Sequence, residues 1–268
     1  MKLRNASYAL AILLAPQFKG VTFFRTVFFR ADCGTEHQVD AALGFHAVPT
    51  SDDLDVITPD AKRVLIADGV ICEQENVVRV SDVARCDGMQ CTVEFGEKKA
   101  ILTNPLFLIP PYRIPLMLAA AAAMILHISP APLNNFTALP GRMSLCREKE
   151  LIIVDNSNSG TNVNTTLCAA RYARHCARDP DLTLVIGQAE GDGAVCEGFP
   201  AEQIAYAIDK VRPSHTIWIG RYPDPGTDLY EALKGTVDTV CTTLEEGRSA
   251  AVRIAEIGSI VLSVKTWR

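Results

Sequence analysis

The chain has 268 residues, which is enough for one large domain or two smaller ones with a sizeable core. Hydrophobic residues make up 48% and charged residues 21%, a composition that excludes a disordered polyampholyte. The formal net charge is -5 and no dense Lys/Arg run occurs, so nucleic acid is not expected as a partner.

Two apolar segments resemble targeting or membrane elements. Residues 8–15 follow Lys2 and Arg4 and imitate a short signal peptide, but a buried strand of a parallel sheet is favoured. Residues 115–128 are too few to cross a hydrocarbon layer of about 30 Å, so we expect a helix packed on both sides and no membrane association. Residues 1–50 show no clear periodicity.

The middle of the chain contains short predicted strands separated by turns. We expect them to form the antiparallel fringe of a sheet, with residues 95–98 as a hairpin turn between the last two. The predicted strands are residues 63–67, 77–80, 91–95 and 100–103. The proline-rich segment 130–140 is the predicted linker between two domains, residues 1–138 and 139–268.

From residue 151 onward, apolar strand-like runs alternate with amphipathic helical segments. This alternation predicts an α/β domain with a Rossmann-like, doubly wound parallel sheet, whose ligand crevice lies at the carboxyl ends of the strands. The predicted strands are residues 151–154, 182–187, 216–220, 237–241 and 260–264. The predicted helices are residues 162–177, 201–211, 228–234 and 244–257.

The nine cysteines are scattered and form no C-x-x-C motif. Cys86 and Cys91 are closest, with four residues between them, but no second pair or neighbouring His accompanies them. We therefore expect no metal site and interpret the cysteines as buried thiols of a cytoplasmic protein.

A phosphate-binding loop of the form G-x-x-x-x-G-K-[ST] is missing from the printed sequence. The glycine-rich segment 187–193 matches neither this motif nor G-x-G-x-x-G, and we interpret it as an ordinary loop after a strand.

The strand-to-loop sequence Asp155-Asn156-Ser157-Asn158 is the first candidate for a ligand site. An Asp at the carboxyl end of a buried strand can accept hydrogen bonds from both hydroxyl groups of a ribose. The alternative is an Asx-turn followed by a helix cap, because Asn, Ser and Thr side chains bind free amide groups in such loops. These residues alone leave the two interpretations open.

Arg142, within Gly141-Arg142-Met143, is the second candidate, because an arginine at a domain junction can stack on a base or pair with a phosphate. A solvated surface arginine is the alternative.

Five segments carry a family resemblance: Leu139 to Met143, Ile152 to Asn158, and residues 109–115, 195–198 and 263–268. Together they resemble the Mur ligase family, in its coenzyme F-430 synthase branch. The sequence DNSNSG departs from the corresponding run of the peptidoglycan members. The likeness covers about residues 57–268.

The resemblance implies a partial central ligase domain in residues 1–138, followed by a Mur ligase C-terminal domain. It implies an ATP-dependent ligase that uses Mg2+, activates a propionate of a nickel tetrapyrrole precursor as an acyl phosphate, and closes a carbocyclic ring with release of ADP and phosphate. By this likeness Arg142 and Asp155 hold the adenosine of ATP, while Asn156, Ser157 and Asn158 shape the same nucleotide site. Tyr112 and Arg113 are assigned to the substrate, and no catalytic residue is assigned.

Family members carry a phosphate loop that this sequence lacks, so we expect an incomplete enzyme that is inactive alone, or one completed by a separate phosphate-loop polypeptide. The alternatives are an amide-forming Mur-like ligase and a nonenzymatic module that binds a nucleotide or a tetrapyrrole.

Overall fold

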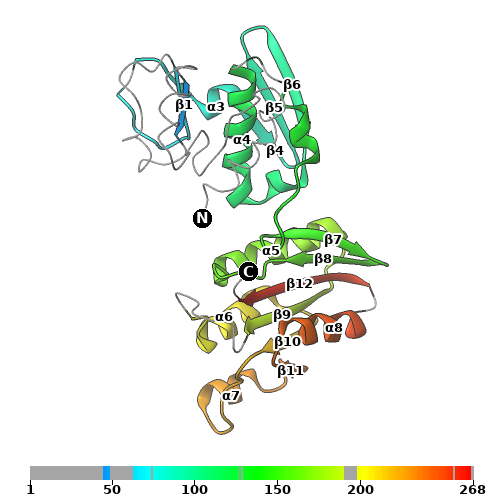
Figure 1. The fold of residues 1–268 in the computed structure, drawn as a ribbon. Coiled ribbons are helices and arrows are strands. Elements are labelled where there is room, and N and C mark those ends of the chain that lie inside the picture. Colours follow the sequence, from blue (N-terminus) through cyan, green and yellow to red (C-terminus); the bar gives the residue numbers. More distant parts are fainter. Residues whose placement is uncertain are drawn as a thin grey trace, which may run out of the picture. The chain divides into compact units, whose positions relative to one another are not determined.

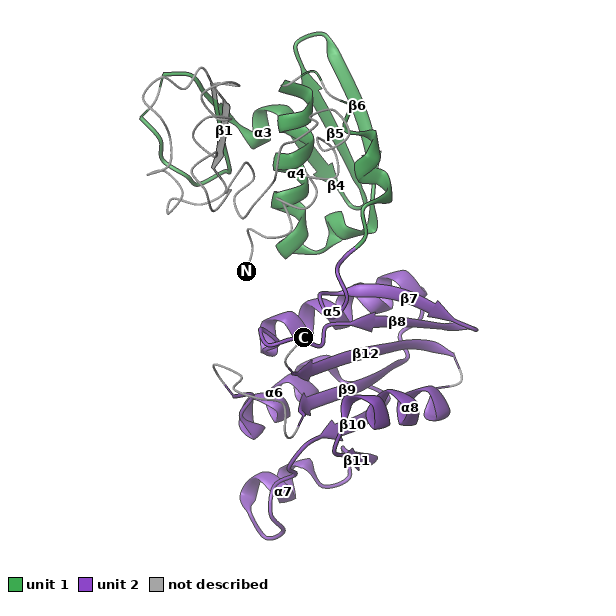
Figure 2. Ribbon diagram, viewed as in Figure 1, with its two compact units in different colours: residues 1–137 green, residues 138–268 purple. Residues whose placement is uncertain are grey.

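The computed structural model describes residues 45–48, 63–73, 75–125, 127, 129–189, 198–255 and 257–266. The chain divides into two compact units, Met1–Thr137 and Ala138–Arg268 (Figure 2). The strand predicted at residues 8–15 and most of the glycine-rich segment 187–193 lie outside the described residues. Within the described ranges, every helix is too short or too polar to span a membrane.

The described residues of the first unit form two small sheets. One is a parallel sheet of β1 (Phe45–Val48), β2 (Arg63–Ile66) and β3 (Val77–Arg79), in that order. The other is an antiparallel sheet of β4 (Ala84–Asp87), β5 (Gln90–Phe95) and β6 (Lys98–Thr103). The short helix α3 (Val80–Val83) connects the two sheets.

The predicted antiparallel fringe is therefore confirmed for β5 and β6 and wrong for β2 and β3. Phe95 pairs with Lys98, as expected for the hairpin turn between β5 and β6. In β2, however, Val64, Leu65 and Ile66 are all at most 1% exposed. Such a run is buried on both faces, which is typical of a parallel strand and differs from the alternation of an antiparallel fringe.

The longest helix among the described residues of this unit is α4 (Pro110–Ile125), which begins and ends earlier than the predicted range 115–128. Pro110 and Pro111 fit its first turn, where amide groups have no helical acceptor. Residues 116–125 are buried all round, so packing on both sides is confirmed. The helix contacts β4 and β5. Two 3-10 helices flank it, η2 (Pro105–Leu108) and η3 (Ala131–Asn135), the latter within the predicted linker.

The second unit is built on a six-stranded sheet (Figure 1), in the order β11-β10-β9-β12-β8-β7. Five strands are parallel, namely β8 (Leu151–Asp155), β9 (Leu182–Gln188), β10 (His215–Ile219), β11 (Thr239–Cys241) and β12 (Gly258–Lys265). The sixth, β7 (Ser144–Glu148), is antiparallel to β8 and was not predicted. Its polar sequence fits a half-exposed edge strand and carries little apolar signal.

Helices cover both faces of this sheet, so the predicted doubly wound α/β fold is confirmed. They are α5 (Val163–Ala177), α6 (Ala201–Val211), α7 (Asp228–Leu233) and α8 (Leu244–Ile254). Leu262 and Val264 of β12 share a core cluster with α8, while Ser263 between them bonds Thr166 of α5. Because successive side chains of a strand point to opposite faces, α5 and α8 cover opposite sides.

Candidate functional site at the carboxyl edge of the sheet

The parallel strands of the second unit all end at one edge of the sheet. Asp155 is the last residue of β8 and pairs in register with Leu262 of the central strand β12. On the other side it lies opposite Ser144 of β7. Polar residues that follow these strand ends are therefore brought to the edge where doubly wound folds bind ligands.

The loop after Asp155 is buried and internally hydrogen bonded. Asn156, Ser157 and Asn158 are only 2%, 0% and 3% exposed. The Ser157 amide donates to Asp155 Oδ1 (3.0 Å), and the Gly160 amide donates to Asn158 Oδ1 (2.8 Å). These are Asx-turns, so this part of the alternative interpretation is present in the structure.

Asn156 connects the loop to the sheet and to the first turn of α5. Its Nδ2 donates to Ser263 Oγ (3.1 Å) and to Thr165 Oγ1 (3.2 Å), and its amide donates to the Leu262 carbonyl (2.7 Å). The helix cap itself is Asn162, which forms a capping box with Thr165. Asn156 therefore holds the loop in place, and Asn162 begins the helix.

The turn that contains Arg142 is tied to the same loop. Asn158 Nδ2 donates to the Gly141 carbonyl over 2.6 Å in a buried position. Gly141 and Met143 both have positive φ angles (+71° and +61°), and Met143 is 4% exposed, so the turn is fixed on both sides of Arg142. Arg142 and Asp155 are both partly exposed. The two residues predicted to bind adenosine therefore lie in two segments that this hydrogen bond joins.

The residues assigned to the substrate lie in the first unit, on α4. Tyr112 is 2% exposed and belongs to the core, whereas Arg113 is partly exposed and donates from Nε to the Phe107 carbonyl (2.6 Å). Arg113 is thus the more accessible of the pair. Substrate binding by either residue stays a prediction.

Lys265, at the end of β12, was given no role from the sequence, although the ending 263–268 supported the resemblance. It is 5% exposed, and its Nζ donates to the Gly198 carbonyl (3.1 Å). Gln188, opposite Lys265 at the end of β9, accepts from the Phe199 amide (2.8 Å). Two neighbouring strands therefore hold Gly198 and Phe199 at this edge. A charged residue at the end of an otherwise uncharged strand was the available signal.

Two glycines allow close backbone approach at the ends of β9 and β10. Gly187 has a φ of +144°, and a Cβ there would collide with the Ile219 carbonyl. Gly220 has a φ of +89°, and a Cβ there would collide with the Gln188 carbonyl. The first glycine of the segment 187–193 is therefore required by strand packing.

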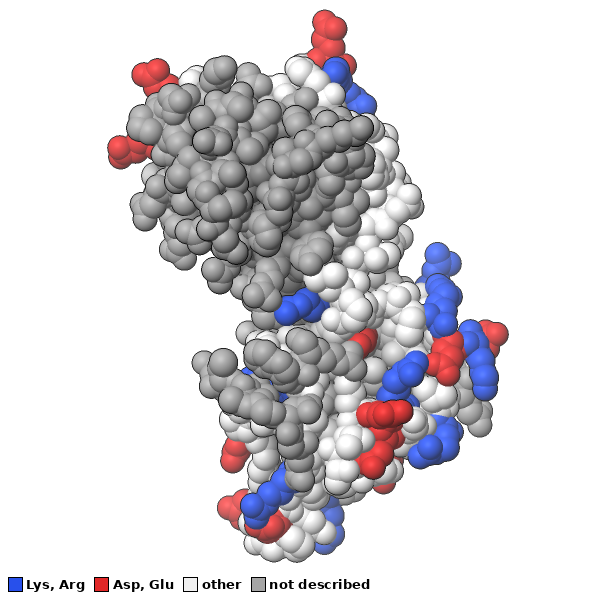
Figure 3. Space-filling model, in the orientation of Figure 1, with Lys and Arg blue, Asp and Glu red and all other residues white. Residues whose placement is uncertain are grey.

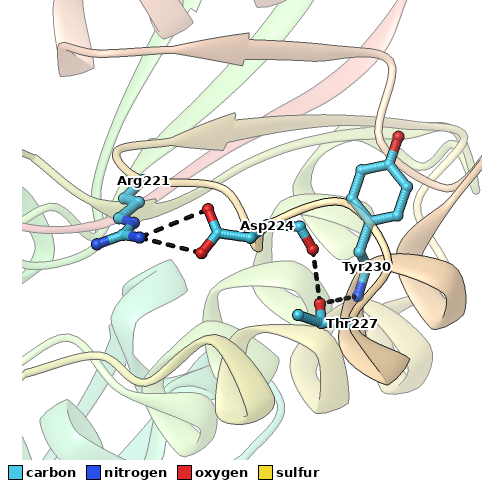
Figure 4. Close-up of polar contacts among 4 residues, drawn as sticks. All are labelled: Arg221, Asp224, Thr227 and Tyr230. Carbon is cyan, nitrogen blue, oxygen red and sulfur yellow. Dashed lines mark hydrogen bonds and ion pairs between the residues drawn. The ribbon is translucent and has the colours of Figure 1, made fainter.

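The loop after β10 is held by its own contacts (Figure 4). Arg221 pairs with Asp224 (3.1 Å), the Thr227 hydroxyl donates to the Asp224 carbonyl (2.8 Å), and the Tyr230 amide donates to Thr227 Oγ1 (3.2 Å). The Tyr222 ring lies edge-on to Trp218, and burial raises the pKa of its hydroxyl. This loop was not predicted as part of a site.

The surface of the second unit carries mixed charge. Figure 3 shows acidic and basic side chains interspersed on the face in view. One such ion pair joins Arg248 to Glu148 over 2.9 Å. Among the residues that the structure describes, no three His, Cys, Asp or Glu side chains are grouped so that they could hold a metal ion.

Comparisons with known proteins agree with this architecture. Residues 146–266 match the family model described as coenzyme F430 synthetase CfbE, C-terminal domain. A coenzyme F(430) synthetase of Methanosarcina acetivorans is 31% identical over 170 residues, which covers 59% of this chain and 34% of that protein. The chain thus spans about a third of the length of this curated relative.

Two solved structures share the fold at low sequence identity. The MurF ligase of Thermotoga maritima, in complex with ADP, is 10% identical with a TM-score of 0.52, over 98% of this chain and 74% of that chain. The UDP-N-acetylmuramate-alanine ligase MurC of Thermotoga maritima is 11% identical with a TM-score of 0.54, over 98% and 69%. These similarities show that the chain shares the fold of Mur ligases.

Proposed function

Because residues 146–266 match the family model described as coenzyme F430 synthetase CfbE, C-terminal domain, we propose that this chain supplies the C-terminal domain of an ATP-dependent ligase. In the proposed reaction, ATP phosphorylates a propionate of a nickel tetrapyrrole precursor. A carbon atom at the ring periphery then attacks the acyl phosphate, a carbon–carbon bond forms and phosphate leaves. The activation is needed because a free carboxylate is a poor electrophile, whereas phosphate is a good leaving group.

The observation that carries the nucleotide part of this proposal is the hydrogen bond between Asn158 and Gly141. It fixes the turn of Arg142 against the loop that follows Asp155. A carboxylate suits the ribose hydroxyls, and a guanidinium suits an adenine face or a phosphate. Preorganised groups of this kind lose little conformational freedom when a ligand binds.

The three residues after Asp155 have a different role in this proposal. Their described polar contacts lie within the protein, through backbone carbonyls, hydroxyls and amides of the same unit. Asn156, Ser157 and Asn158 therefore act by shaping the site, while Arg142 and Asp155 contact ATP. Mg2+ would enter with the phosphates of the nucleotide.

Calorimetric titration with ATP tests the nucleotide site. We expect measurable binding by the wild-type chain and about tenfold weaker binding by Asp155→Asn, because the variant loses a charge-assisted hydrogen bond of about 1.5 kcal/mol. This substitution keeps an oxygen that can accept from the Ser157 amide. Asp179→Asn is the matched control, since Asp179 forms the same turn with Asp181 on an exposed surface. Equal affinities for all three proteins would reject the assignment of Asp155.

Two further measurements separate the candidate functions. We expect no phosphate release from MgATP by this chain alone, because its sequence contains no phosphate-loop motif. A second mixture adds the tetrapyrrole precursor and a separate polypeptide that supplies the phosphate loop. ATP binding without turnover in that mixture would favour a nonenzymatic module. An amide-forming ligase would gain if an amino acid, and no tetrapyrrole precursor, supported turnover in that mixture.

A further inference from the structure

The two cysteines that lie closest in the sequence face each other in the first unit. β4 and β5 form a hairpin in which Gly88 and Met89 make the two-residue turn, and Gly88 has the positive φ (+57°) that such turns need. The register pairs Asp87 with Gln90 and Cys86 with Cys91. Cys86 and Cys91 are thus direct cross-strand partners, and their side chains lie on the same face.

The ladder geometry favours a bond between these two residues. In a hairpin with a two-residue turn, the pair beside the turn exchanges backbone hydrogen bonds, and the next pair does not. Cys86 and Cys91 occupy this second position, where Cα atoms are about 4.5 Å apart and side chains approach most closely. That spacing lies within the range of about 4.4–6.8 Å that disulfides require.

The surroundings make the two thiols unequal. Cys86 is partly exposed, whereas Cys91 is completely buried. The Cys91 thiol donates to the Cys86 sulfur, and this hydrogen bond, together with the positive charge of Arg113, lowers the pKa of Cys86. The same hydrogen bond and burial raise the pKa of Cys91. Cys86 is therefore the accessible sulfur that more readily forms a thiolate, and Cys91 is its buried partner.

We propose that Cys86 and Cys91 are a reversible oxidation site, at which a low-molecular-weight disulfide converts the two thiols into a cross-strand disulfide. The Cys86 thiolate attacks one sulfur of the oxidant and releases the other half as a thiolate. Cys91 then loses its proton to that thiolate and attacks Cys86, which releases the second half. The protein loses two electrons and two protons, and the oxidant is reduced to two thiols.

The modification acts next to Arg113. Helix α4, which carries Arg113, contacts both β4 and β5. In the reduced protein the thiolate form of Cys86 is stabilised by the guanidinium of Arg113. In the oxidised protein Cys86 can no longer form a thiolate beside Arg113, while the hydrogen bond from Arg113 Nε to the Phe107 carbonyl can persist. Oxidation therefore removes a titratable thiol beside the arginine that the family resemblance assigns to a substrate.

Mass spectrometry of the whole chain in glutathione buffers tests the proposal. Trypsin releases residues 86–98 as one peptide with both cysteines, and disulfide formation lowers its mass by two hydrogen atoms. We expect the native protein to form this disulfide at least about tenfold more favourably than the same chain unfolded in urea, because only the fold holds the thiols together. Equal or weaker oxidation of the native protein would overturn the proposal.

Single variants test the order of attack. In the Cys91→Ala variant, a glutathione adduct should form on Cys86 faster than on Cys72, which is another partly exposed thiol. In Cys86→Ala, Cys91 should stay unmodified while the protein is folded. Both variants need a circular dichroism spectrum like that of the wild type. As a control, Cys146→Ala removes an exposed thiol of the second unit and should leave the equilibrium of disulfide formation between Cys86 and Cys91 unchanged. A Cys86 adduct that forms no faster than the Cys72 adduct would contradict the assigned order.

Discussion

Asn158 donates a buried hydrogen bond of 2.6 Å to the carbonyl of Gly141, seventeen residues earlier in the chain. The same side chain accepts from the Gly160 amide through its other polar atom. One asparagine therefore holds two segments that approach the sheet edge from different directions, the turn of Arg142 and the loop after Asp155.

Asn158→Ala should destabilise the second unit. The substitution leaves the Gly141 carbonyl and the Gly160 amide without this partner, which costs about 1–3 kcal/mol in a buried site. Urea unfolding monitored by circular dichroism measures the loss. Gln203→Ala, on an exposed position of α6, is the control and should change the unfolding free energy little. A variant as stable as the wild type would show that the bond does not hold the turn.

Asn158→Asp gives a sharper test of the same bond. It keeps an acceptor for Gly160 but places a carboxylate oxygen against the Gly141 carbonyl. The variant should be less stable than Asn158→Ala at neutral pH and should recover as the pH falls, because a protonated carboxyl can donate. Unfolding midpoints in urea at pH 7 and pH 4 are the measurement, and a pH-independent difference from wild type would speak against this geometry.

Gly220→Ala should strongly destabilise the sheet edge, by about 2–4 kcal/mol, because a methyl group would collide with the Gln188 carbonyl and because the backbone conformation there is strained for alanine. Gly226→Ala is a matched control. Its φ of +86° is almost the same as the +89° of Gly220, but no described atom other than its chain neighbours lies within 4 Å of the added carbon. The control should therefore lose only the conformational part, roughly 1 kcal/mol. Equal effects in thermal unfolding would mean that the close approach to Gln188 is unimportant.

The capping box of α8 predicts a pH dependence of stability. Hydrogen bonds from the Thr242 hydroxyl and from the amides of Thr242 and Thr243 lower the pKa of Glu246. A carboxylate whose pKa is lower in the folded state stabilises the fold above its unfolded pKa, and this contribution is lost as the pH falls.

Glu246→Ala should therefore lower the thermal midpoint at pH 7, and its difference from wild type should shrink below about pH 4.5, near the ordinary carboxyl pKa. Differential scanning calorimetry across this range is the measurement. Glu245→Ala, also in the first turn of α8, should show a smaller difference. A constant deficit from pH 7 to pH 3 would rule out the ionised carboxylate as the source of the effect.

Lys265→Met should alter the segment that returns to the sheet at Gly198. The substitution removes the hydrogen bond to the Gly198 carbonyl but also removes a charge from a position that is 5% exposed. Since replacing a buried charge by an apolar group of similar size is often neutral, we expect global stability to change by less than about 1 kcal/mol. Hydrogen exchange of the Phe199 amide should become faster, while exchange in β8 stays the same. Unchanged protection at Phe199 would mean that Gln188 alone holds this segment.

The periodic features of this chain were predictable because they are local. The apolar runs at residues 151–154 and 182–187 fall within β8 and β9, and helix α6 has the predicted bounds. Element ends were less predictable. Helix α4 begins five residues before the predicted start, because its first-turn prolines do not follow the apolar pattern.

The candidate site was predictable only in its location. The apolar strand followed by short polar residues indicated the carboxyl edge of a parallel sheet. The same residues could not distinguish a ligand contact from an Asx-turn, because both use the same side-chain atoms. The structure separates the residues by exposure: Asn156, Ser157 and Asn158 are buried, and Arg142 and Asp155 are partly exposed.

By itself the sequence determined the alternation of strands and helices in the second unit, since a short apolar run or a period of 3.6 residues is visible within one segment. Only the tertiary structure decided which distant groups meet. Asn156 reaches Ser263, Asn158 reaches Gly141, and Cys86 faces Cys91 across a hairpin. These pairings depend on strand order and register, which arise when many weak contacts are satisfied together and which no single segment specifies.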